Sequence, residues 1–150
     1  MNIQDIYESW EQDSVFERDK LSEESIKIPQ LHSKYMKILS QERMKSKAIT
    51  HQYKQLYKIK HEYYRGDLDM ETLQAYGWEP FNLKVLRQDL DMYIDQDDDI
   101  IDARQKMEIQ KEKITLIEGI IQQINTRGFQ IKNVIDWEKF KAGLWSRLRR

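Results

Sequence analysis

Apolar residues recur every three or four positions along two long stretches of this chain, and each stretch predicts a long amphipathic helix. The first repeat runs from Ile28 to Tyr63, and Gly66 follows where such a helix is expected to end. Pro29 suits the first turn of this helix, where its missing N–H costs nothing. The middle of the repeat is interrupted by three polar residues, Glu42, Lys45 and Gln52. The interruption indicates a bend, a register-setting device or a buried contact between subunits.

The second repeat runs from Ile100 to Ile124. Isoleucine at both core positions of a heptad favours assemblies larger than a dimer, at least in parallel coiled coils. We therefore expect this helix to hold subunits together, with packing inside a single chain as the alternative. Gly128 is expected to end the helix, and residues 136–143 are expected to form a short last helix. The predicted oligomerisation residues are Ile114, Ile117, Ile121, Ile124, Phe129 and Ile131.

The segment between the two repeats predicts a connector with little regular structure. One helical turn is expected from Met70 to Tyr76, closed by Gly77, and a further helix over residues 83–94. The aspartates that begin at Asp95 mark the start of the next long helix, because acidic side chains are favourable at a helix N-terminus. Residues 1–20 are acidic with scattered aromatics, and we expect them to form a short helix or docking arm outside the core.

Composition supports an all-α fold class, since 34% of the residues are charged and the chain has only two prolines and five glycines. There is no cysteine, which excludes disulfides and thiolate chemistry. The acidic N-terminus and the lack of any apolar run of about 18 residues predict a soluble intracellular protein without a signal peptide.

Charge is segregated along the chain, although the formal net charge is only −1. The net charges are about −5 for residues 1–33, +7 for 34–65, −9 for 67–102 and +6 for 103–150. Acidic blocks can pair with basic blocks between subunits, or restrain a basic surface from indiscriminate binding.

Basic and tyrosine side chains follow one flank of the first helix, opposite its apolar repeat. With Ile49 at heptad position a, they occupy positions b, c and f, an arc of about 100°. The members are Arg43, Lys47, His51, Lys54, Tyr57, Lys58, His61, Tyr64 and Arg65. Residues 34–65 hold nine Lys or Arg against two Glu. Phosphates attract cations and unpaired bases stack on flat rings, so this flank predicts binding of a single nucleic-acid strand.

Four regions follow from these patterns. They are an acidic N-terminal arm (1–20), a helical single-strand-binding region with a connector (21–82), a helical oligomerisation region (83–144) and a basic tail (145–150). The alternative to nucleic-acid binding is a structural helical scaffold whose charges only pair between subunits.

A metal-dependent nuclease built on the aspartates between Asp95 and Asp102 is a further alternative. An EF-hand that began at Asp95 would need glycine at its sixth position and glutamate at its twelfth, where the chain has Ile100 and Lys106. The three histidines lack metal-type spacing, and no P-loop, nucleophile elbow or zinc motif is present. We therefore expect no enzyme activity, no metal and no cofactor.

Several blocks of the sequence resemble the UvsY family, the recombination mediators of large tailed phages. The blocks are Leu31–Tyr35, Leu56–Gly66 and Arg127–Lys132, followed by Asp136, Phe140 and Ala142–Gly143. The resemblance implies a helical protein that forms a hexameric or heptameric ring through its C-terminal part. It also implies binding to single-stranded DNA, to a phage RecA-like recombinase and to the phage single-strand-binding protein, in the cytoplasm of the infected bacterium and without a membrane.

The two cations of the family's basic motif correspond to Lys58 and Lys60. The predicted DNA-binding residues are therefore Arg43, Lys47, Lys54, Tyr57, Lys58, Lys60, His61, Tyr64 and Arg65. The family pattern has arginine where this chain has Lys60. Lysine keeps the charge but lacks the planar fork that stacks and bridges phosphates. Ile59 and His61 also depart from the pattern.

Overall fold

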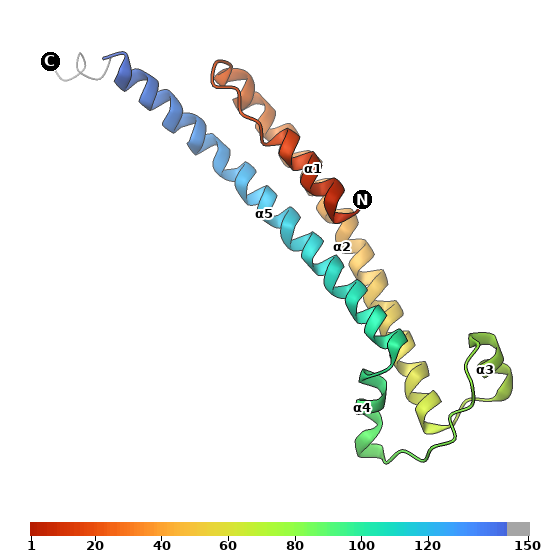
Figure 1. Ribbon diagram of the computed structural model, residues 1–150. Helices are drawn as coiled ribbons and strands as arrows, with labels where there is room; N and C mark the ends of the chain where they lie inside the picture. Colours follow the sequence, from red (N-terminus) through yellow and green to blue (C-terminus); the bar gives the residue numbers. More distant parts are fainter. Residues whose placement is uncertain (144–150) are drawn as a thin grey trace. The chain divides into compact units, whose positions relative to one another are not determined.

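A computed structural model describes residues 1–143, in which all regular structure is helical (Figure 1). The elements are α1 (Ile3–Asp13), α2 (Leu21–Arg65), α3 (Met70–Tyr76), the 3-10 turn η1 (Arg87–Asp89), α4 (Leu90–Asp95) and α5 (Asp98–Lys141). The predicted all-α class is confirmed. None of the helices in this range combines the length and the apolar character that a membrane crossing requires. The basic tail expected at 145–150 lies outside the described residues.

The chain divides into two compact units. Unit 1 contains Met1–Glu42 together with the described chain from Glu112 onward, and unit 2 contains Arg43–Lys111. The long helices α2 and α5 each contribute one part to unit 1 and another to unit 2.

Unit 1 is built around a core shared by α1, α2 and α5. The buried members are Ile6, Tyr35, Leu39, Ile117, Ile120, Ile121 and Ile124. The core begins with α1, whose first turn is fixed by a capping box between Asn2 and Asp5. Ile6 is fully buried, so α1 belongs to the core of unit 1, contrary to the expected arm outside it. The fully buried Tyr35 donates its hydroxyl to Asp13 at 2.8 Å, and burial raises the pKa of Tyr35 to about 12.

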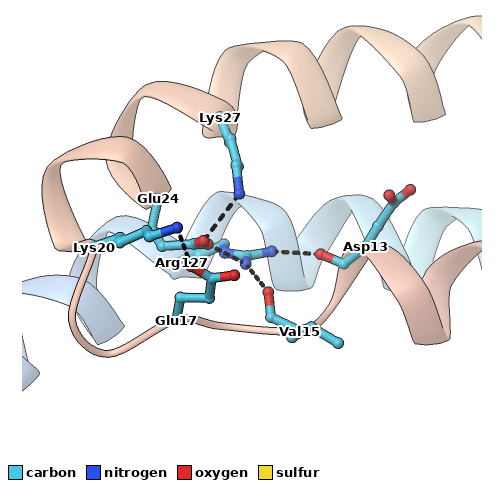
Figure 2. A network of polar contacts seen from close by, with 7 residues as sticks. All are labelled: Asp13, Val15, Glu17, Lys20, Glu24, Lys27 and Arg127. Carbon is cyan, nitrogen blue, oxygen red and sulfur yellow. Dashed lines mark hydrogen bonds and ion pairs between the residues drawn. The ribbon is translucent and has the colours of Figure 1, made fainter.

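A buried arginine joins α5 to the loop between α1 and α2 in unit 1 (Figure 2). The Arg127 guanidinium donates to the carbonyl oxygens of Asp13 and Val15, each at 3.0 Å, and pairs with Glu24 at 2.8 Å. Lys27 also reaches Glu24, at 3.1 Å. Burial by itself would raise the pKa of Glu24, but Lys27 and Arg127 lower it overall. The network replaces the water lost by two buried charges and fixes the path of the loop.

Unit 2 contains both predicted turns. Gly66 ends α2 with φ +78°, and Gly77 ends α3 with φ +70°, conformations that favour glycine. After Gly77 the chain returns alongside α2. The Tyr63 hydroxyl donates to the carbonyl oxygen of Glu79 at 2.7 Å, and the Phe81 ring lies 4.9 Å from the Tyr64 ring.

Three predicted helix boundaries are wrong. α5 continues through Gly128 to Lys141, so the expected stop and the separate helix over 136–143 do not exist. Gly128 has no positive φ, and its cost within a helix is only about 1 kcal/mol, which an otherwise favourable helix tolerates. α2 begins at Leu21, which places Pro29 inside the helix instead of in its first turn. The helix expected over residues 83–94 begins later, because residues 83–86 are not helical and regular structure starts with η1 and α4.

Candidate nucleic-acid interface

Three lysines of α2 form the accessible centre of the predicted cationic flank. Lys47, Lys54 and Lys58 are exposed, and within residues 1–143 none of them has an ion-pair partner. Along the helix axis they are separated by about 10 Å and then about 6 Å, at 1.5 Å per residue. Their ammonium groups are therefore available to an external anion.

The other cations of the flank differ in their surroundings. Arg65 is exposed and its Nε lies 3.2 Å from Asp67, while Arg43 is exposed and engaged in a contact within the protein. His51 is exposed and His61 is half-buried.

The two tyrosines predicted to stack on bases are used, to different degrees, inside unit 2. Tyr64 packs its ring against Phe81 and Tyr93, with centroids 4.9 and 6.0 Å apart, and donates its hydroxyl to Asp97 at 2.6 Å. Burial and this carboxylate raise the pKa of Tyr64. Tyr57 is half-buried and donates to Asp91 at 3.1 Å. The Tyr57 ring also contacts the Tyr53 ring, with centroids 6.1 Å apart.

Lys60 does not lie on the accessible flank, which corrects the expectation from the family pattern. The residue is 3% exposed, and its Nζ lies 3.0 Å from Asp97, 2.8 Å from Asp99 and 3.9 Å from the ring centre of Trp78. Burial by itself would raise the pKa of Asp97, but the hydrogen bond from Tyr64 and the Lys60 ammonium lower it overall. The ammonium is therefore occupied by intramolecular carboxylates and an aromatic face.

Lys60 is buried because of the register with which α2 packs. Positions that alternate by four and three residues are all buried or half-buried: Tyr35, Leu39, Glu42, Ser46, Ile49, Tyr53, Leu56, Lys60 and Tyr63. These are heptad positions a and e, whereas the apolar repeat was assigned to a and d. The change rotates the buried face by about 50°, at 100° per residue. At the polar break the d residues Lys45 and Gln52 are exposed, whereas the d residues Leu31, Ile38 and Ile59 remain half-buried.

The predicted oligomerisation residues lie mostly inside unit 1. Ile117, Ile121 and Ile124 belong to its core, Ile131 is buried and Ile114 is half-buried. The isoleucine seam therefore packs within one chain, which was the alternative to packing between subunits. Phe129 is different, because 73% of it is exposed. Trp137 and Phe140 are also exposed on α5 and stack on each other, with centroids 5.6 Å apart.

The acidic run before α5 serves as a helix start, as predicted. The Asp97 carboxylate accepts from the backbone N–H groups of Asp99 and Ile100, at 2.9 and 3.2 Å. Residues 1–143 contain no group of three or more His, Asp or Glu arranged to hold a metal ion. Asp97 and Asp99 are instead the partners of Lys60.

The described residues form an all-helical protein with a row of exposed lysines on α2. Residues 9–144 match the model of the family described as the recombination, repair and ssDNA binding protein UvsY. The chain belongs to the UvsY family, and this membership implies a role in recombination with binding of single-stranded DNA.

Individual relatives agree with this assignment. The chain is 24% identical over 143 residues to the recombination protein uvsY of Enterobacteria phage T4, covering 95% of this chain and 99% of that protein. Two crystal structures of the bacteriophage T4 recombination mediator protein UvsY have the same fold. The first has a TM-score of 0.81 at 22% identity and covers 95% of this chain and 98% of its own. The second has a TM-score of 0.78 at 20% identity, with coverages of 94% and 99%.

Proposed function

We propose that this protein is a non-enzymatic recombination mediator. Several copies, joined in a ring, bind single-stranded DNA in the cytoplasm of the infected bacterium. The bound protein contacts a RecA-like recombinase and the phage single-strand-binding protein, and helps the recombinase displace that protein and nucleate its filament. The proposed DNA-binding residues are Arg43, Lys47, Lys54, Tyr57, Lys58, His61 and Arg65.

The observation that carries the proposal is the row of exposed ammonium groups on α2, formed by Lys47, Lys54 and Lys58, none of which has an ion-pair partner among the residues that the structure describes. A protein that neutralises a phosphate releases a condensed counterion, which favours binding and makes it depend on salt. Lys60 and Tyr64 are left out of the contact set, because their side chains are already packed against acidic and aromatic groups of unit 2.

A ring suits the modest strength of one such row. Its three lysine contacts give a log–log salt slope of only about −2, at about 0.7 per contact, and binding is weak at physiological salt. Joining several copies makes the later contacts intramolecular and raises the avidity by about 10²- to 10⁴-fold. Many individually weak contacts hold a strand and still release it, which is what transfer to a recombinase requires. The exposed Phe129, Trp137 and Phe140 are the apolar side chains that we propose for subunit contacts.

The test of DNA binding replaces Lys54 and Lys58 by glutamine. Binding of oligothymidylate, followed by fluorescence anisotropy over a range of salt, should weaken, and the salt slope should fall by about 1.4 for every engaged copy. Lys106→Gln is the matched control, because Lys106 is an exposed lysine of unit 2 on α5. If the double variant binds like the control, the row only balances charge between subunits, as in a structural scaffold.

The mediator activity has its own assay. Strands coated with single-strand-binding protein are mixed with the RecA-like recombinase, and its ATP hydrolysis is followed with and without this protein. We expect the lag before filament growth to shorten with the wild type and to remain long with the double variant. An equal lag in the presence and absence of the wild type would refute mediation.

A further inference from the structure

A second cationic group joins the flank at the C-terminal end of α2, where a polar cavity of about 500 Å³ opens in unit 2. Its lining residues are His61, Arg65, Asp67, Val85, Arg87 and Leu90. Arg87 comes from the acidic part of the sequence, 22 positions after Arg65, and the sequence pattern gave no reason to join it to the flank.

The connector brings Arg87 to this place. Tyr63 holds the carbonyl oxygen of Glu79, and Phe81 packs against Tyr64, so the chain after α3 runs back past the end of α2 (Figure 1). This aromatic packing and the 2.7 Å hydrogen bond hold the first part of the connector against the end of α2.

The charged groups around the cavity suit an anion. Arg87 is exposed and has no ion-pair partner within the described part of the chain. Asp67 engages the Nε of Arg65 at 3.2 Å. A guanidinium has five donor hydrogens, so this contact orients the group and leaves its terminal N–H groups for another acceptor. The half-buried His61 adds an imidazole to the same wall.

Size and position specify the ligand further. A cavity of about 500 Å³ lies in the range of small-molecule sites and exceeds what a bare phosphate needs. Val85 and Leu90 supply an apolar side suited to a sugar ring. Lys54, Lys58, His61 and Arg65 follow one another at helical spacings of three or four residues, so the cavity continues the row of lysines.

We propose that this cavity is a nucleotide subsite that binds one backbone phosphate of single-stranded DNA between Arg65 and Arg87, with the attached sugar against Val85 and Leu90. The subsite rests on the proposed DNA binding and extends it to a residue outside α2. It anchors the strand at one end of the lysine row.

The test compares Arg87→Gln with Lys84→Gln, a neighbouring exposed cation of the connector that does not line the cavity. Oligothymidylate without terminal phosphates is titrated across salt into the full-length proteins. We expect Arg87→Gln to reduce the salt slope by about 0.7 for every engaged copy, and Lys84→Gln to leave it unchanged. Arg87→Lys should restore the slope, because it restores the charge, but not the full affinity, because it lacks the guanidinium fork.

Failure of the subsite and failure of the proposed function look different. If Arg87→Gln binds like Lys84→Gln while the Lys54 and Lys58 variant loses affinity, the subsite is refuted and the lysine row stands. If Arg87→Gln and the Lys54 and Lys58 double variant both bind like wild type, DNA binding by this whole face is refuted. Circular dichroism before each titration verifies that the variants are folded.

Discussion

Replacing Lys60 by methionine tests whether this lysine stabilises the fold or contacts DNA. The substitution keeps an unbranched side chain of similar length and removes the ammonium. Asp97, whose side chain is 8% exposed, then loses its closest cation but keeps the Tyr64 hydroxyl and two backbone N–H groups. Asp99 is 54% exposed and is rehydrated at little cost.

The expected loss of stability follows from these partners. Removing one member of a buried ion pair costs about 3–5 kcal/mol, and the hydrogen bonds that remain on Asp97 offset part of this cost. Loss of the contact with Trp78 adds about 0.5–2 kcal/mol for a cation over an aromatic ring. We expect the free energy of unfolding to fall by about 3 kcal/mol, measured by urea denaturation at fixed protein concentration.

DNA binding, unlike stability, should not change in the Lys60→Met variant. At temperatures where Lys60→Met is folded, its salt slope for oligothymidylate should equal that of the wild type. Lys58→Met, at an exposed position, should lose about 0.7 from the slope for every engaged copy and keep its stability. If Lys60→Met lost slope but no stability, the buried ion pair would be wrong as an account of this residue.

Other substitutions and conditions test the two units. Arg127→Met should lower the free energy of unfolding by about 3–5 kcal/mol, because it leaves the buried Glu24 without its guanidinium, and an unchanged urea midpoint would contradict this. Gly128→Ala should raise stability by about 1 kcal/mol, since the added Cβ meets nothing within 4 Å, whereas Gly77→Ala at φ +70° should lower it by about 1 kcal/mol. Equal melting temperatures for these two variants would refute the placement of Gly128 inside a helix and of Gly77 at a left-handed helix end. The folded-state pKa values of Glu24 and Asp97 are lowered, so their contribution to stability is present above about pH 4 and is lost as pH falls through those pKa values. Melting temperatures from pH 6 to pH 3 should therefore decline, and a flat profile would exclude a role for these carboxylates.

The sequence by itself determined the features that depend on neighbouring residues. The all-α class follows from the three-to-four repeat and from the scarcity of proline and glycine. The bounds of α3 and the ends at Gly66 and Gly77 were predicted correctly, since a left-handed helix end needs glycine whatever packs around it. The row of Lys47, Lys54 and Lys58 was predicted from helical spacing, and it is exposed.

Only the tertiary structure decided which face of each helix is buried and what the charged groups contact. The a and e register of α2 depends on where α4 and α5 pack, and this packing encloses Lys60 between Asp97 and Asp99. In the same way, Ile117 and its neighbours on α5 are covered by α1 and α2 of their own chain. A periodic pattern specifies that a side is apolar but not which segment covers it, because the covering residues are distant in sequence. Arg87 reaches the cationic end of α2 for the same reason, since the fold of the connector, and not local spacing, brings it there.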